Sequence, residues 1–153
     1  MNKRLIWALV ASTFATSATS LETPSPQRLA PSLEHAQTAY LSSQLLGRYH
    51  YKTQALDDAM SEKIFERYLK ALDPERLFFT QADIDSFADA RTRLDDAILR
   101  GNLSIPFSIF QRYERRSVER LTHAREVLKQ GFEFDTRESY PYMRKKAPWP
   151  KDD

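Results

Sequence analysis

Apolar side chains recur at steps of three and four residues through most of this chain, and that period constrains the fold more than any other feature. Four segments carry it: 33–47, 57–73, 80–101 and 104–131. A β-rich protein of this size would need period-two alternation and many glycine turns, whereas this chain has only three glycines. The sequence therefore predicts an all-α fold, a bundle of about four amphipathic helices.

Capping residues mark the ends of these helices. Ser32 precedes the first segment, and Asp57 and Thr80 begin the second and third; at these positions a side-chain oxygen can accept hydrogen bonds from free backbone N–H groups. Asp83 follows Thr80 by three residues, which is close to a capping box. All three glycines are predicted to follow helix ends as C-caps: Gly47, Gly101 and Gly131.

The N-terminus has the three-part order of a secretory signal. Lys3 and Arg4 come first, an apolar run follows over 5–15, and small residues fill 16–20. The apolar run is too short to span a bilayer, so a membrane anchor is the weaker alternative. We expect residues 1–20 to be a signal peptide that is removed on export. The formal net charge then falls from +2 to zero.

Two irregular segments flank the predicted helical domain, 33–131. Residues 21–32 contain three prolines and form an extended leader, and the tail, 132–153, alternates aromatic residues and prolines with charges. Because the tail is rich in exposed aromatic groups, we expect it to pack on another surface. It closes with Trp149-Pro150 and two aspartates, a pattern that suits the start of a further helix, so we expect it to lead towards a downstream segment.

The 104–131 segment carries arginines at four-residue steps: Arg112, Arg116 and Arg120. Glutamates are interleaved with them, and Arg115 with Glu119 forms an i,i+4 pair. A neutral, exported chain favours a solvated charged face over a nucleic-acid interface. The two preceding helices lean acidic, so their attraction to this basic helix explains both charge biases.

No pattern of side chains predicts a catalytic, cofactor or metal site. The chain has no cysteine, and its three histidines lie in separate segments without a two-ligand helical spacing: His35, His50 and His123. Asp83-x-Asp85 lacks the glycine of a calcium loop. The serines lie in caps, in the leader or within helices, away from any strained glycine-flanked turn. We therefore predict no catalytic residue, no cofactor and no metal ion.

The segment 50–87 is more specific than its helical pattern requires. It contains His50-Tyr51, Leu56-Asp57-Asp58, Ser61, Ile64-Phe65, Tyr68-Leu69, Leu72-Asp73-Pro74, Phe78-Phe79, Asp83-Ile84 and Phe87. Together with KAPWPK at 146–151, it closely resembles the N-terminal helical domain of tail-specific proteases, also called carboxy-terminal processing peptidases. The resemblance covers roughly 33–151.

The resemblance implies a periplasmic serine endopeptidase of Gram-negative bacteria. Such enzymes recognise apolar C-terminal tails through a PDZ domain and cleave with a serine and lysine dyad, both further along the polypeptide. The chain is then expected to be a fragment, an N-terminal scaffold and docking domain that is inactive alone. Its expected partners are the downstream PDZ and protease domains, with unfolded substrates or an adaptor as further partners. We expect no nucleic acid and no stable membrane span. The alternative is an independent exported adaptor or chaperone-like module.

Overall fold

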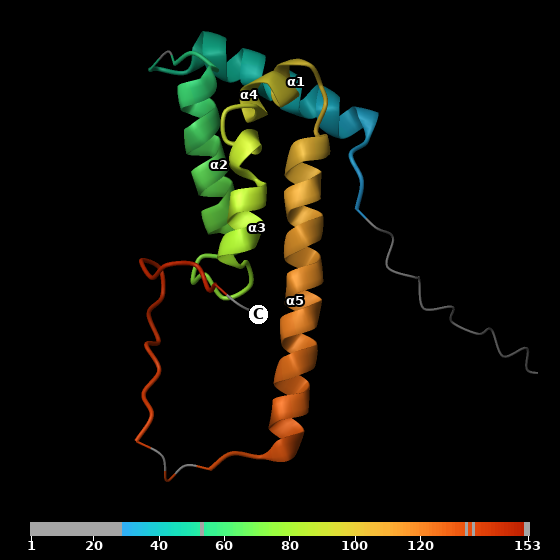
Figure 1. Ribbon diagram of the computed structural model, residues 1–153. Helices are drawn as coiled ribbons and strands as arrows, with labels where there is room; N and C mark the ends of the chain where they lie inside the picture. Colours follow the sequence, from blue (N-terminus) through green and yellow to red (C-terminus); the bar gives the residue numbers. More distant parts are fainter. Residues whose placement is uncertain (1–28, 53, 134, 136, 152–153) are drawn as a thin grey trace, which may run out of the picture.

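The computed structural model describes residues 29–52, 54–133, 135 and 137–151. These residues form five α-helices and one 3-10 helix and no strand, which confirms the all-α prediction. The elements are α1 (Leu33–Tyr49), α2 (Asp58–Leu72), α3 (Gln81–Ser86), η1 (Ala88–Ala90), α4 (Leu94–Leu99) and α5 (Ser104–Gln130). In Figure 1, α2 and the much longer α5 run alongside each other, α3 and α4 lie between them, and α1 crosses one end. The predicted signal peptide lies outside the described residues.

The predicted N-caps are confirmed. Ser32, Asp57 and Thr80 each accept a hydrogen bond from the backbone N–H three residues further on, and Thr80 forms a capping box with Asp83. The C-cap predicted at Gly47 is wrong. The first helix continues to Tyr49 and is capped by His50, because a glycine inside a helix costs only about 1 kcal/mol. Gly101 and Gly131 do follow helices, with left-handed φ angles of 65° and 77°.

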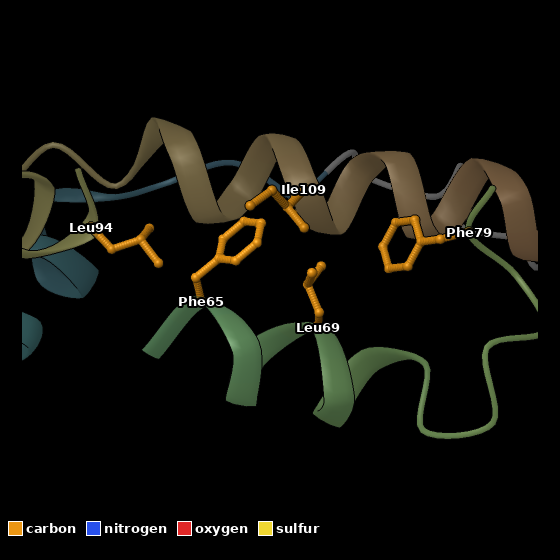
Figure 2. Close-up of a cluster of buried hydrophobic side chains, with 5 residues drawn as sticks. All are labelled: Phe65, Leu69, Phe79, Leu94 and Ile109. Carbon is orange, nitrogen blue, oxygen red and sulfur yellow. The ribbon is translucent and has the colours of Figure 1, made fainter. Parts of the chain in front are cut away.

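Five buried side chains form the core (Figure 2). Phe65 and Leu69 come from α2, Phe79 from the turn before α3, Leu94 from α4 and Ile109 from α5. They converge from four separate parts of the chain, so the core ties all of these elements together. Partly buried residues from α3, the N-terminal half of α5 and the tail pack around this cluster.

The segment 80–101 begins and ends as predicted, but it is not one helix. It breaks into α3, η1 and α4, and the buried Ser61 of α2 lies at the second break. The Ser61 hydroxyl donates to the Arg91 carbonyl at 2.9 Å and accepts from the Leu94 N–H at 2.8 Å. A continuous helix would use both backbone groups in its own hydrogen bonds. A tertiary contact from α2 therefore satisfies the backbone where the helix stops.

The last helix follows its prediction closely, since α5 covers Ser104–Gln130. Its N-terminal half packs on the core, whereas its C-terminal half extends beyond the other helices (Figure 1). After α5 the described residues form neither helix nor strand. They turn back along the molecule and reach the turn between α2 and α3.

Candidate functional site

The turn between α2 and α3 is built around the buried carboxylate of Asp73. Its two oxygens accept hydrogen bonds from the backbone N–H groups of Leu77, Phe78 and Phe79, at 2.8, 2.8 and 3.0 Å. Bonds from backbone N–H groups to an ionised carboxylate are stronger than neutral ones, so this single side chain fixes the turn. The fixed turn directs the ring of Phe79 into the core, where it is fully buried.

The tail docks on this turn through Trp149. The Trp149 ring meets Phe79 edge-on, with 6.0 Å between ring centres. The guanidinium of Arg76 also lies over the Trp149 ring, 5.0 Å from its centre. Arg76 also donates a hydrogen bond to the Ala147 carbonyl. The tail was expected to pack on another surface, and over this stretch that surface is the domain's own turn.

Backbone and charge contacts extend this docking along the tail. The N–H of Gln81, at the start of α3, donates to the carbonyl of Pro150 at 2.7 Å. Glu75 accepts from the Arg144 backbone N–H at 3.0 Å and lies 3.6 Å from the Lys145 ammonium. The chain is therefore held beside α3 at the end of its described part.

A second buried carboxylate, Asp83, joins α3 to α5. Its side chain is 2% exposed. Its two carboxylate oxygens form ion pairs with the guanidinium groups of Arg112 and Arg116, each with an N–O distance of 2.8 Å. Burial by itself raises the pKa of Asp83, but hydrogen bonds from Arg116 and Thr80 outweigh it and hold the pKa below its usual value. Asp83 is thus an ionised clamp between the two helices.

The interpretation of the arginine stripe as a solvated face is wrong for Arg112 and Arg116. Both guanidinium groups turn towards Asp83, and only 17% of the Arg116 side chain is exposed. The predicted attraction between the acidic and basic helices is confirmed at this point. Sequence reasoning missed the role of Asp83 because capping already explained an acid there. The available signal was two arginines one helical turn apart on α5.

The helix α1 turns its small residues inwards and its large apolar residues outwards. Ala36 is buried against the rest of the domain, and Ala39 and Ser43 are half-buried on the same side. The exposed large side chains of α1 are Leu33, Tyr40, Leu41, Leu45, Leu46 and Tyr49. An apolar helix face of this kind is typical of a surface that another protein part covers. We call these six residues the α1 outer face.

The C-terminal half of α5 carries a second exposed apolar row. Leu121 and Leu128 are 55% and 63% exposed, and Val118 is 60% exposed. Further along, Tyr140, Tyr142 and Met143 of the tail also remain exposed. The domain therefore has a well-packed centre and apolar side chains at both of its extremities.

Two of the three histidines singled out in the sequence have local contacts, and the third, His123, is exposed on α5. His35 accepts from the Ser32 backbone N–H, and His50 bonds to the backbone of Lys52. Asp85 accepts from the Gln81 side chain. Among the described residues, no group of three potential ligands could hold a metal ion. None of the helices described is both long and apolar enough to cross a bilayer.

Comparison with known proteins places this arrangement in a family. The family profile described as "Tail specific protease N-terminal domain" matches residues 41–153, which include the Asp73 turn, the Asp83 clamp and the docked tail. The Tail-specific protease of Haemophilus influenzae is 36% identical over 107 residues. The match takes in 69% of this chain and 15% of the length of that relative. The chain therefore belongs to the family of tail-specific protease N-terminal domains.

Proposed function

We propose that this chain is the N-terminal helical scaffold and docking domain of a periplasmic tail-specific serine endopeptidase, which processes C-termini and degrades proteins. The family match over residues 41–153 carries the proposal. The matched relative is far longer than the matched segment, which is 15% of its length. The PDZ domain and the serine and lysine dyad that the family implies belong to that remaining length.

The docking role is supported by the α1 outer face. Leu41 and Leu45 are more than half exposed although they lie in a helix with little charge on its outer side. Burying a leucine that is otherwise exposed contributes about 1.5–3 kcal/mol. Downstream domains of the same polypeptide are the partners we assign to this face, because they would remain next to it at high effective concentration.

A chimera tests this role. The matching segment of the Haemophilus protease is replaced by the corresponding part of this chain, and cleavage of an unfolded protein with an apolar C-terminal tail is measured. We expect the chimera to cleave and a deletion of the segment to be inactive. Leu41→Glu in the chimera should lower cleavage at least about tenfold, which corresponds to about 1.4 kcal/mol. Lys63→Glu, at an exposed position of α2 outside the α1 outer face, is the control.

A folded chimera that is no more active than the deletion would contradict the scaffold role. Equal effects of Leu41→Glu and Lys63→Glu would contradict the docking surface alone.

We also propose that the chain by itself has no peptidase activity. Ser61, the one fully buried serine among the described residues, donates its hydroxyl proton to the Arg91 carbonyl and accepts from the Leu94 N–H, so the hydroxyl is already engaged. The purified chain should leave the same unfolded substrate intact, as followed by mass spectrometry. Hydrolysis that persists through further purification steps would refute this.

Export to the periplasm follows from the order of residues 1–20, which is that of a secretory signal. Expression in a Gram-negative host should yield a shortened chain in the periplasmic fraction, beginning after Ala18 or Ser20. N-terminal sequencing checks both points, and an intact Met1 in the cytoplasmic fraction would oppose the proposal.

The second candidate function is an independent adaptor or chaperone-like module, and the docked tail favours it. Because Trp149 packs on Phe79, the domain covers part of its own core without any other domain. Such a module should slow the aggregation of an unfolded protein when added as the separate chain. Under the scaffold proposal the separate chain has no such effect.

A further inference from the structure

A cleft of about 580 Å³ lies between α2, α3 and the docked tail. Leu69 of α2, Ile84 of α3 and Trp149 of the tail supply its apolar lining. The volume falls within the range of about 300–1,000 Å³ that is usual for ligand sites. The cleft exists only because the tail returns to the turn, since Trp149 forms part of its wall.

Cationic side chains dominate the polar lining of this cleft. They come from α2, from the turn, from the residue after η1 and from the tail: Lys70, Arg76, Arg91, Lys145 and Lys146. The two acids in the lining, Glu66 and Asp73, are already engaged. Glu66 pairs with Arg91 at 3.1 Å, and Asp73 accepts its three backbone hydrogen bonds in the turn. The cleft therefore presents an excess of positive charge.

Two of the cations are available to a ligand. Lys70 and Lys146 are exposed and make no ion pair within the described part of the chain. Arg76 and Arg91, by contrast, lie over the rings of Trp149 and Phe65. Unpaired ammonium groups beside a leucine and an indole match a ligand that alternates carboxylates with apolar groups.

We propose that this cleft binds an extended segment of another protein that carries at least two acidic side chains with apolar residues between them. The two available cations come from separate elements, Lys70 from α2 and Lys146 from the tail, so two carboxylates can be paired at once. A single terminal carboxylate would leave one of the two unmatched. This inference is independent of the proposed function, because it requires no downstream domain.

The sequence supplies a reporter for this binding. Trp7 and Trp149 are the two tryptophans of the chain, so Trp7→Phe leaves Trp149, in the cleft wall, as the only indole. The probe is a hexapeptide of alternating leucine and glutamate, acetylated and amidated at its ends. We expect a saturable change in Trp149 fluorescence, and binding at least about tenfold tighter than that of the glutamine counterpart. Binding should also weaken with added salt.

Charge reversal locates the site. Lys70→Glu and Lys146→Glu, each in the Trp7→Phe chain, should weaken binding at least about tenfold. Lys63→Glu is the matched control, because Lys63 is exposed on α2 two turns before Lys70 and does not line the cleft. It should change binding by less than about twofold, since exposed charges at that distance are largely screened. Circular dichroism verifies that all three variants fold.

Several results of these binding experiments would contradict the proposed site. Absence of a fluorescence change, or equal binding of the glutamine peptide, overturns the proposal. Equal losses for Lys63→Glu and Lys70→Glu reduce the effect to general attraction between charges and also overturn it. Binding of only a peptide with a free C-terminal carboxylate would replace it by a chain-terminus site. None of these results changes the activity of the protease chimera, so the two proposals fail separately.

Discussion

The two halves of α5 have similar sequence patterns and different surroundings. In the N-terminal half, Ile109 is fully buried, and Ile105 and Tyr113 pack around it. In the C-terminal half, Leu121 and Leu128 continue the helical spacing but are mostly exposed. Periodicity therefore tells which side of a helix is apolar, but not whether that side has a partner within the same domain.

Removing a ring from the packed region should have the largest effect. Phe79→Ala removes the ring of a fully buried core residue, and a change of this kind costs about 3–5 kcal/mol. Urea unfolding followed by circular dichroism measures the loss in the free energy of unfolding. Tyr142→Ala, at an exposed position of the tail, should cost less than about 0.5 kcal/mol. Similar losses for both would mean that the buried ring of Phe79 does not stabilise the core.

Breaking the Asp83 clamp should cause the second-largest loss in the free energy of unfolding. Asp83→Asn leaves Arg112 and Arg116 without their carboxylate, and removing one partner of a buried ion pair costs about 3 kcal/mol or more. Asp85→Asn changes an exposed acid of the same short helix and should stay within about 0.5 kcal/mol. If the two substitutions cost the same, the clamp contributes nothing specific.

The clamp should also make stability depend on pH. Because the pKa of folded Asp83 is below its usual value, its contribution is complete above the unfolded pKa of about 3.9 and is lost as pH falls through the folded pKa. The stability difference between the native chain and Asp83→Asn should therefore shrink as the pH is lowered from 7 towards 2.5. Thermal unfolding at several pH values tests this, and a constant difference would argue against an ionised clamp.

Undocking the tail should have a smaller effect on the core. Trp149→Ala removes one edge-on ring contact and one cation–π contact, together about 1–2 kcal/mol. We expect trypsin to cut faster after Arg144 and Lys145, as followed by mass spectrometry, because their backbone is no longer held. An unchanged cleavage rate would show that Arg76 and Glu75 hold the tail without the indole.

Substitutions in the exposed C-terminal half of α5 should have the smallest effect on the free energy of unfolding. Leu128→Ser should change the free energy of unfolding by less than about 0.5 kcal/mol, because this side chain is mostly exposed. Binding of a dye that reports apolar surface should fall at the same time. If Leu128→Ser lowered the free energy of unfolding as much as Phe79→Ala, the C-terminal half of α5 would be no less tightly packed than the N-terminal half.

The sequence predicted the structural features that depend on neighbouring residues, such as helix caps. It missed the features that depend on residues far along the chain. Ser32, Asp57 and Thr80 announce helix starts because a cap bonds to N–H groups three residues away. The break in 80–101 could not be foreseen, since its backbone is satisfied by Ser61 from another helix. Asp83 was understood as a cap, yet its arginine partners lie about 30 residues further along the chain.

The return of the tail has a consequence for how this domain tolerates change. The chain is anchored at the end of α5 and again from Arg144 onwards, on either side of the stretch 132–143. The entropic cost of closing the chain between two anchors rises by only about 0.6 kcal/mol for each doubling of its length. Insertions or deletions there are therefore inexpensive, and they leave unchanged the place beside α3 from which the polypeptide departs.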